Sequence, residues 1–496
     1  MYPGAHDPTR PAVVMAGSGR VVTYGELEDH ANRLAQHWWG LGLRKGDHVA
    51  MLVCNVPEAF EVYWAALRSG LYVTAVNRHL TADEAAYVIT DCGARSLVVS
   101  PELGAAVVDK TPLVEDRLSL GPLEGHTLYD AALASASPDP LPDRPRGADM
   151  LYSSGTTGRP KGIQPPLPEG QVDEVRETLI SLAAGVWGFG PDTVYLSPAP
   201  VYHAAPLRFG ASTLALGGTV VVMERFDALE ALALIEKHQV THSQWVPTMF
   251  VRMLKLTDTE RARHDLSSMR VALHAAAPCP VEVKQAMLDW WGPIVHEYWS
   301  STEANGLTLI GPEDWLSHPG SVGKAALGVL HICDDDGTEL PAGEVGTVYV
   351  ERDELPFRYH GDPEKTAEAQ HPAHPTWTTT GDLGRVDEEG FLYLTDRKAF
   401  MIISGGVNIY PQEVEDALAL HPLVADAAVL GVPDEEMGQR VKAFVQPSGA
   451  APSDLAEQLE AFLRERIAGY KVPREWELRD ELPRTPTGKL VKGRLL

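Results

Sequence analysis

The amino-acid sequence predicts an α/β protein with three parts: a large N-terminal body of βα-layered subdomains, a small β-rich subdomain and a small α+β C-terminal domain. Three observations predict this organisation. Helix-periodic segments alternate with short apolar segments through the first half of the chain. From Gly320 short strand-like segments separated by Gly and Asp turns follow, and the pattern changes again after Asp396. Alternating strands and helices favour parallel sheets covered by helices.

The helices of the first half carry clear boundary signals. Leu27, Ala31, Leu34 and Trp38 recur at helical spacing, and Gly40 ends that segment. Pro57 favours the start of a second helix, because proline suits the first helical turn. Thr81 with Glu84 fits a capping box at the start of a third.

The remaining elements follow from short apolar runs, helical spacing and turn residues. A proline-rich stretch, residues 137–147, is expected to be a loop or linker. Helices are expected at 229–238, from Pro411, and after Asp454, which we expect to cap its helix together with Glu457. Strands are expected at 48–54, 97–100, 194–197, 219–223, 270–275, 345–351, 391–395, 425–432 and 441–446. The predicted domains are 1–395 and 396–496, with a hinge at 396–400.

Composition excludes several classes of protein. The 496 residues have a net charge of −26, which argues against a general nucleic-acid binder because such proteins need a basic footprint. The longest uncharged run, residues 209–223, is short and broken by glycines, which argues against a membrane span. No signal peptide is evident, and four widely spaced cysteines fit reduced thiols, so we expect a cytoplasmic protein.

One segment is dense in phosphate-binding chemistry. Residues 152–162 read Tyr-Ser-Ser-Gly-Thr-Thr-Gly-Arg-Pro-Lys-Gly. Glycines let backbone amides converge on an anion, hydroxyl groups add donors, and Lys161 supplies a positive charge. The GxxxxGK[ST] spacing of a Walker loop is absent, which disfavours a P-loop ATPase.

This segment resembles the phosphate loop of the adenylate-forming superfamily, which includes acyl-CoA synthetases, aryl-CoA ligases, luciferases and peptide-synthetase adenylation domains. The resemblance covers essentially the whole chain, and four further motifs follow in the family's order. They are the aromatic-x-x-Thr-Glu segment at 297–303, the Thr-Gly-Asp-Leu turn at 380–383, the hinge and thiolation loop at 396–411, and the lysine loop at 483–489.

The resemblance implies a role for each motif. Glu303 would help to bind Mg2+, Trp299 would stack on adenine, and Asp382 would accept hydrogen bonds from the ribose hydroxyls. Arg397 would contact ribose or phosphate, and Lys489 would reach between the carboxylate and the α-phosphate. The implied nucleotide-binding set is Ser153, Ser154, Gly155, Thr156, Thr157, Lys161, Ala276, Ala277, Pro278, Glu297, Trp299, Ser300, Thr302, Asp382 and Arg397, and the implied catalytic set is Lys489, Glu303, Thr156 and His203.

Two further subsites are implied. Ser404, Gly405 and Gly406 would let the pantetheine arm of CoA approach the backbone closely, after a rotation of the mobile C-terminal domain. The acyl group would bind among His203, Phe209, Gly210, Trp245, Val246, Ala275 and Ser300.

Each of these residues also has an ordinary structural interpretation. Trp299 could be core packing, Asp382 a turn residue, Arg397 half of a surface ion pair and Lys489 a solvated tail residue. His203 is balanced between a structural residue and a gate to the acyl site.

The chain departs from the family pattern at two places. Trp299 and Ser300 stand where the family often has Tyr-Gly, and Ala399 and Phe400 stand where many relatives have a charged or polar hinge pair. These departures bear on adenylation efficiency and on the hinge, and not on the fold.

The resemblance implies an ATP-dependent acid–CoA ligase of lipid or natural-product metabolism. It would convert a hydrophobic carboxylic acid, whether fatty, steroid-like or otherwise bulky and apolar, to an acyl-AMP with release of pyrophosphate, and then to a CoA thioester. The expected partners are the acid, ATP, Mg2+ and CoA, and a homodimer is left open. The alternatives are loading of a carrier protein, an enzyme proficient mainly in thiolation, and a ligand-binding relic without catalysis.

Overall fold

The computed structural model describes residues 2–153, 160–397, 400–405, 407–434, 437–484 and 490–495. The chain divides into two compact units. Unit 1 comprises Met1–Gln244, Asp258–Ala272 and Pro356–Pro363, and unit 2 comprises Trp245–Thr257, Leu273–Leu355 and Glu364–Leu496. The predicted domain boundary at Asp396 falls inside unit 2 and stays a prediction.

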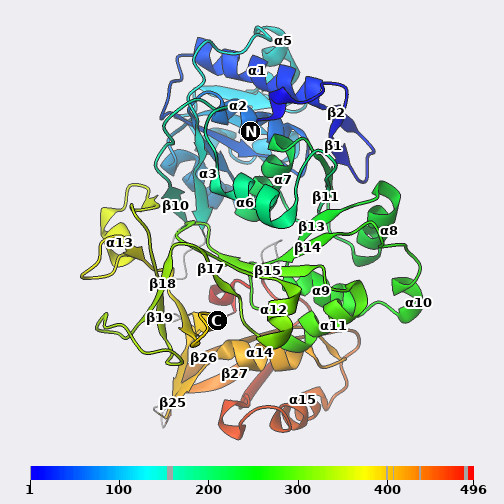
Figure 1. The fold of residues 1–496 in the computed structure, drawn as a ribbon, viewed down its shortest axis with the longest axis vertical. Helices are drawn as coiled ribbons and strands as arrows, with labels where there is room; N and C mark the ends of the chain where they lie inside the picture. Colours follow the sequence, from blue (N-terminus) through cyan, green and yellow to red (C-terminus); the bar gives the residue numbers. More distant parts are fainter. Residues whose placement is uncertain are drawn as a thin grey trace. The chain divides into compact units, whose positions relative to one another are not determined.

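Unit 1 contains a parallel six-stranded sheet in the order β7-β6-β5-β3-β4-β8. It belongs to the part of the chain coloured blue to cyan in Figure 1. Its central strands are buried almost throughout and lack polar alternation, as expected for a parallel sheet with helices packed on it. The strands are β3 (His48–Leu52), β4 (Tyr72–Ala75), β5 (Ala94–Val99), β6 (Asp116–Ser119), β7 (Thr127–Leu128) and β8 (Ala148–Asp149), and the associated helices are α1 (Tyr24–Gly40), α2 (Glu58–Leu67), α3 (Ala82–Asp91), α4 (Pro101–Gly104) and α5 (Tyr129–Ala134).

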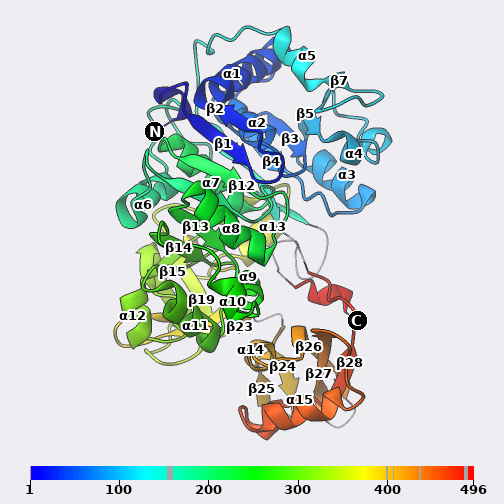
Figure 2. The same cartoon turned by 90° about the vertical axis from the view of Figure 1, so that its right-hand side faces the viewer.

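A second group of strands in unit 1 runs in the order β2-β1-β12-β11-β13, with β2 antiparallel to β1 and the other pairings parallel. Figure 2 shows β1 and β2 side by side with β12 next to them. The strands are β1 (Pro11–Met15), β2 (Val21–Thr23), β11 (Val194–Ser197), β12 (Thr219–Val222) and β13 (His242–Trp245). The helices α6 (Thr178–Trp187), α7 (Ala204–Ala215) and α8 (Ala228–His238) lie between them in the chain, and α10 (Asp258–Arg261) comes after β13.

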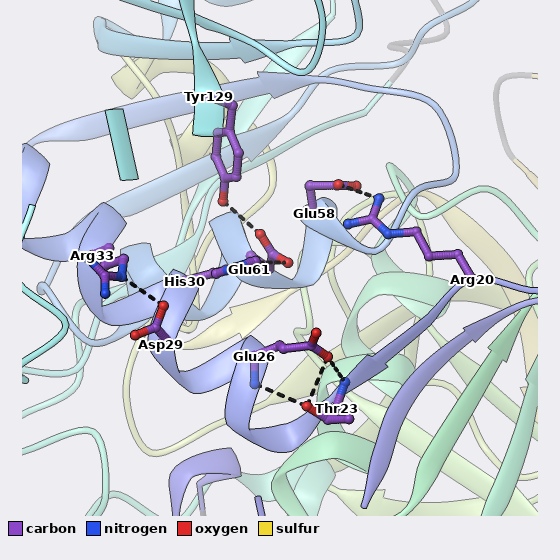
Figure 3. Close-up of polar contacts among 9 residues, drawn as sticks. All are labelled: Arg20, Thr23, Glu26, Asp29, His30, Arg33, Glu58, Glu61 and Tyr129. Atoms are coloured by element: carbon purple, nitrogen blue, oxygen red, sulfur yellow. Dashed lines mark hydrogen bonds and ion pairs between the residues drawn. The ribbon is translucent and has the colours of Figure 1, made fainter. Parts of the chain in front are cut away.

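Helix α1 begins at a reciprocal capping box (Figure 3). The Thr23 hydroxyl accepts from the Glu26 backbone amide, and the Glu26 carboxylate accepts from the Thr23 amide at 2.8 Å. Two backbone donors that the helix itself cannot satisfy thereby gain partners. One turn further along, Arg33 pairs with Asp29 at the i,i+4 spacing that supports an exposed helix face.

A buried carboxylate joins α1, α2 and α5 (Figure 3). Glu61 on α2 has no exposed surface, and its two oxygens face the Tyr129 hydroxyl and the His30 imidazole, each at 2.9 Å. Burial raises the pKa of the Glu61 carboxyl, and these two partners act against that shift. The hydrogen bond to Glu61 raises the pKa of His30 despite partial burial.

The first part of unit 2 contains an antiparallel run β15-β16-β17 and the β-rich subdomain. Within the subdomain, β19 lies next to β18 on one side, and both β21 and β22 pair with it. The elements are α9 (Pro247–Leu254), β14 (Val271–His274), α11 (Val281–Trp291), β15 (Val295–Ser300), β16 (Leu307–Ile310), α12 (Pro312–Ser317), β17 (Lys324–Leu327), β18 (Val329–Cys333), β19 (Gly346–Glu351), α13 (Pro363–Glu368), β21 (Trp377–Thr378), β22 (Asp382–Val386) and β23 (Leu392–Arg397).

The C-terminal part of unit 2 is a compact α+β sheet-and-helix unit (Figure 2). Leu455, Leu459 and Leu463 recur at helical spacing on α15 and are fully buried, in one cluster with residues of α14, β26 and β27. The elements are β24 (Ile402–Ser404), β25 (Val407–Ile409), α14 (Pro411–Ala419), β26 (Val424–Asp434), β27 (Gly438–Pro447), α15 (Leu455–Arg464) and β28 (Glu475–Leu478). Three strands remain in unit 1, β9 (Leu151–Ser153), β10 (Lys161–Gln164) and β20 (Arg358–Tyr359), together with short 3-10 turns at Pro3–Ala5 and Val108–Lys110; those at Gly469–Lys471 and Lys492–Arg494 belong to unit 2.

The predicted elements are present, with one local correction. The Thr81–Glu84 capping box forms, and Pro57 is the N-cap of α2. Asp454 precedes α15, but its side chain does not cap the helix backbone. Its carboxylate instead accepts from the Gln458 side chain at 3.0 Å, because the cap residue departs from the extended backbone that aims a capping oxygen at the first turn.

Two smaller expectations concern cysteines and membranes. The four cysteines are free thiols, Cys92 and Cys333 buried and Cys54 and Cys279 half-buried. In the described part of the chain, no helix combines the length and apolar character needed to cross a membrane.

We predict that stability gained from His30 declines as the pH rises. Because the folded-state pKa of His30 is raised above 6.5, its protonated form stabilises the fold below that value, and the contribution is lost as the pH rises through the raised pKa. Melting temperatures between about pH 6 and about pH 9 should therefore fall more for the wild type than for His30→Asn. His264→Asn, which removes a more peripheral pairing with Glu236, is the control. Parallel pH curves for wild type and His30→Asn would contradict the prediction.

Candidate active site

The predicted phosphate loop joins two paired strands of unit 1. β9 and β10 are antiparallel, and Ser153 lies directly opposite Lys161. The ends of the predicted loop are therefore held together by a strand ladder, and the Lys161 ammonium lies 5.3 Å from the centre of the Tyr359 ring on β20. Ser154, Gly155, Thr156 and Thr157 lie outside the described residues.

Asp382, predicted to contact ribose, begins β22 just after an interruption in a strand. Thr378 of β21 lies opposite Val350, and Leu383 of β22 lies opposite Thr347 on the same strand, β19. Between these two pairings the β21–β22 segment covers five residues, from 378 to 383, whereas β19 covers only three, from 350 back to 347. Two residues of the β21–β22 segment therefore bulge out of the ladder. Gly381 lies in this bulge with φ of 82°, a left-handed conformation that favours glycine.

The Asp382 carboxylate is largely buried and held in position. Its Oδ2 accepts from the Thr380 hydroxyl at 2.8 Å, and the Gly381 amide donates to the Thr379 hydroxyl at 3.0 Å. In the neighbouring strand β23, Arg397 lies opposite Asp382 in the backbone register. The two residues predicted to meet ribose are therefore cross-strand neighbours, whereas Lys489 lies outside the described residues.

The Thr302–Glu303 segment follows β15 and is tied to the same region. Asn305 donates from its side-chain amide to the Thr378 backbone oxygen at 3.3 Å, and its own oxygen accepts from the Ser301 hydroxyl at 2.9 Å. Asn305 is 1% exposed and Glu303 is 9% exposed, so both lie inside the unit. One hydrogen bond thus connects the segment that carries the predicted magnesium residue to the strand that precedes the predicted ribose turn.

Backbone strain accompanies these segments. Ala276 has φ of 75° and Ala304 has φ of 50°, left-handed values that side chains other than glycine adopt at a cost of about 1–2 kcal/mol. Ala276 belongs to the predicted nucleotide segment Ala276, Ala277 and Pro278, and Ala304 follows Glu303 directly. Such strain occurs preferentially at functional sites, where the surrounding structure holds it.

Trp299 and Glu297 have structural partners in unit 2. Trp299 packs into the core of the β-rich subdomain with Val350 and Leu392, and 9% of its surface is exposed. Glu297 pairs with Lys284 of α11 at 2.6 Å and lies 3.4 Å from the His274 ring. Burial raises the pKa of Glu297 and Lys284 opposes that shift, so the pair is a buried ion pair. The nucleotide roles of both residues stay predictions.

The predicted thiolation loop is a tight turn in the C-terminal part. Ser404 and Val407 pair across β24 and β25, and Gly405 between them has φ of 58°. The Gly405 amide donates to the Met437 backbone oxygen at 2.8 Å, and a Cβ at Gly405 would lie 2.4 Å from the Met437 side chain. Conformation and space therefore both favour glycine here. Gly406 lies outside the described residues.

Three predicted acyl residues belong to unit 1. His203 precedes α7 and its ring lies 4.3 Å from that of Tyr202. Phe209 is 1% exposed and packs among aromatic rings, including Trp187 at 5.9 Å. A Cβ at Gly210 would lie 2.6 Å from the Phe60 ring, so glycine is needed there for the packing of α7 on α2. Packing accounts for Phe209 and Gly210, and their acyl roles stay predictions.

The other predicted acyl residues belong to unit 2. Trp245 is fully buried, and its ring meets that of Trp291 edge-on at 5.6 Å. Val246 is the N-cap of α9, and Ala275 donates its backbone amide to the Trp245 oxygen at 3.3 Å. Trp245 thus lies among the rings of Phe250 and Trp291, and the contact of these predicted residues with an acyl group stays a prediction.

Comparison with known proteins decides the family. The AMP-binding enzyme family matches residues 4–359, and its C-terminal domain family matches residues 413–489. The chain belongs to the AMP-binding enzyme family. The predicted membership of the adenylate-forming superfamily, the AMP-forming ligase class and the α/β fold with a large N-terminal and a smaller C-terminal domain are thereby confirmed.

Relatives of this AMP-binding enzyme match along almost their whole length. A fatty acid–[acyl-carrier-protein] ligase, ScoC, of Streptomyces coeruleorubidus is 33% identical over 99% of this chain and 93% of its own. A feruloyl-CoA synthase of Amycolatopsis sp is 35% identical over 97% of this chain and 95% of its own. The structure of ATP-bound MatB from Rhodopseudomonas palustris has a TM-score of 0.84 at 30% identity, covering 99% of this chain and 95% of that one.

Sequence reasoning missed two residues that organise this enzyme's site. Asn305 connects the Glu303 segment to β21, and Lys284 neutralises Glu297 from another element. Lys284 carried a usable signal, since a lysine within an otherwise apolar helix face requires a buried partner. Asn305 carried none, because its partner is a backbone oxygen more than seventy positions away.

We predict that Ser300→Gly does not lower adenylation. The Ser300 hydroxyl donates to the Gly306 oxygen at 2.8 Å, so its hydrogen bond is made within the enzyme. Losing that bond should cost about 1 kcal/mol of unfolding free energy and leave pyrophosphate exchange unchanged. Ser300→Ala separates loss of the hydroxyl from added backbone freedom. A folded Ser300→Gly enzyme without exchange activity would show that Ser300 is a required contact.

Proposed function

We propose that this AMP-binding enzyme is an ATP-dependent acid–CoA ligase acting on a hydrophobic carboxylic acid. In the first half-reaction the acid attacks the α-phosphate of ATP, forming an acyl-AMP and releasing pyrophosphate. In the second, the CoA thiol attacks the acyl carbon, giving the thioester and AMP.

One observation carries the nucleotide part of the proposal. The Asn305–Thr378 hydrogen bond joins the Glu303 segment to the strand that leads into the Asp382 bulge. A nucleotide whose ribose hydroxyls donate to Asp382 would therefore place its phosphates within the region that Glu303 serves. Buried carboxylates with fixed partners suit this role, because preorganised groups lose little freedom on binding.

The residues present fit a magnesium ion that arrives with ATP. Mg2+ prefers oxygen ligands and is usually held by one or two carboxylates together with substrate phosphates. Among the described residues, no cluster of three or more His, Cys, Asp or Glu side chains could hold a metal by itself. Glu303 would supply the one carboxylate ligand, and the phosphate oxygens of ATP would supply others. When bound, the ion would neutralise charge on the phosphate oxygens.

We further propose that residues 396–496 form a mobile C-terminal domain that serves both half-reactions. Lys489 would stabilise charge at the α-phosphate during adenylation, and Arg397 would contact ribose or phosphate beside the hinge. The loop of Ser404, Gly405 and Gly406 would then receive the pantetheine arm of CoA. Its support is the left-handed backbone of Gly405, a conformation that favours glycine.

Two of the relatives support a hydrophobic acid as substrate. They differ in the acceptor of the acyl group, which is a carrier protein in one and CoA in the other. A fatty acid–carrier-protein ligase and a feruloyl-CoA synthase match this chain about equally well. The first favours an aliphatic acid and a carrier protein, and the second favours an aromatic acid and CoA. The aromatic and apolar character of the predicted acyl residues fits either acid.

The experiment is a panel of carboxylic acids of rising chain length and ring count, each assayed for ATP-dependent pyrophosphate release. Active acids are then offered CoA, or a phosphopantetheinylated carrier protein, and the thioester is identified by mass. We expect pyrophosphate release with apolar acids and thioester formation with CoA. Thioester on the carrier alone would establish the carrier-loading alternative. Turnover only of a supplied acyl-AMP would establish an enzyme specialised for thiolation, and ATP hydrolysis to ADP would overturn the proposal.

We predict that Lys489→Ala separates the half-reactions. Because Lys489 would act on transition-state charge at the α-phosphate, its loss should lower the kcat of adenylation by about a hundredfold or more while the KM for ATP changes little. Conversion of a supplied acyl-AMP with CoA should persist. Lys471→Ala, which removes a lysine paired with Glu413, is the control on the same part of the chain. Equal loss of both half-reactions in Lys489→Ala would contradict the role.

A further inference from the structure

The face of β19 turned away from the Trp299 core carries an unusual polar cluster. Val350 points into that core, so its neighbours Tyr349 and Glu351 point to the other face. His331 of β18 lies opposite Tyr349, and Trp377 of β21 lies opposite Glu351. Side chains from three neighbouring strands thus meet on one face of the sheet.

His331 is held by carboxylates at both ring nitrogens. Its Nδ1 lies 2.9 Å from Glu339, and its Nε2 lies 3.0 Å from Glu351. His331 therefore connects Glu339 to Glu351 through its two ring nitrogens.

The same His331 ring lies flat against Trp377. Their centres are 3.5 Å apart and their planes differ by 8°. Stacked ring pairs add packing energy beyond their buried area. His374 is also stacked on Trp377 at 4.1 Å, and His371 lies 5.2 Å from the same ring. His371 donates one hydrogen bond from Nε2 to the Gly337 oxygen, so it is anchored independently.

Trp377 is the first residue of the segment that leads to Asp382. The two-residue bulge has β21 on its upstream side and β22 on its downstream side, both paired with β19. β22 spans five residues and is also paired with β23, whereas β21 consists of Trp377 and Thr378 alone. Backbone bonds from His371 to the Trp377 oxygen and from Thr379 to the Ala369 oxygen, each 2.9 Å long, also hold the upstream side, together with the Asn305 bond to Thr378. The contacts of the Trp377 side chain add to these bonds.

We propose that His331, which bridges Glu339 and Glu351, is a positioning residue that holds the Trp377 ring and thereby helps to fix the upstream end of the Asp382 bulge. The proposal rests on the proposed nucleotide role of Asp382. It makes nucleotide affinity depend on a side chain at position 331 that both stacks on Trp377 and bonds to the two carboxylates.

The test compares His331→Gln with His331→Arg. Glutamine has no ring or guanidinium plane to stack on indole, whereas arginine stacks on indole and can donate to both carboxylates. His318→Gln is the matched control, because His318 is also stacked on an aromatic ring, Phe391 at 3.7 Å, and faces Glu389. Binding of a non-hydrolysable ATP analogue is measured together with KM and kcat for ATP in pyrophosphate exchange.

We expect His331→Gln to weaken nucleotide binding roughly threefold to tenfold, with kcat little changed. His331→Arg should restore most of the lost affinity, because it keeps both the stack and the carboxylate contacts. Thermal melts identify any variant that fails to fold. If His331→Gln does not fold, His331→Phe, which keeps a ring on Trp377 without donors to the carboxylates, takes its place.

Two outcomes would overturn the inference: unchanged nucleotide affinity in His331→Gln, or a change in kcat alone. Asp382→Ala separates this failure from failure of the proposed function. If Asp382→Ala weakens the analogue and His331→Gln does not, the positioning role of His331 is wrong and the ribose role stands. If Asp382→Ala leaves binding unchanged, the ribose role itself is wrong.

Discussion

The pairing of two short segments with one strand, β19, is the constraint on which the candidate site depends. Because β21 and β22 share that partner out of register, two residues must leave the ladder, and Gly381 makes the turn that results. One face of β19 contributes to the core around Trp299, and the other carries the stack of His331 on Trp377. The position of Asp382 therefore depends on side-chain packing on both faces of β19.

Buried polar groups in both units are retained where a partner from another element satisfies them. Glu61 joins three helices of unit 1 through Tyr129 and His30, and Glu297 meets Lys284 in unit 2. Removing one partner would leave a buried charge uncompensated, which costs more than the intact pair contributes. Asn305 is likewise buried and satisfied by a partner from another element, the backbone oxygen of Thr378. This bond lies within the candidate site.

Local signals predicted the elements well. The Thr81–Glu84 capping box and the helix starting after Pro57 depend on residues within one turn of each other, so sequence is sufficient for them. The Asp454 cap failed because its backbone conformation is decided by the preceding loop. Phe209 and Gly210 were expected near the acyl group, yet their visible contacts are aromatic packing and the fit of α7 on α2. Apolar residue type alone does not distinguish a cleft wall from a core.

By itself the sequence determined the order of elements, the family and the residue types able to handle ATP, because each of these is encoded in contiguous motifs such as residues 152–162 and 380–383. Only the tertiary structure decided that Asn305 reaches Thr378, that Arg397 lies opposite Asp382, and that His331 stacks on Trp377. Each of these relations depends on strand register and on side chains far apart in the chain. Register is set by the packing of whole sheets, so no local pattern of residues contains it.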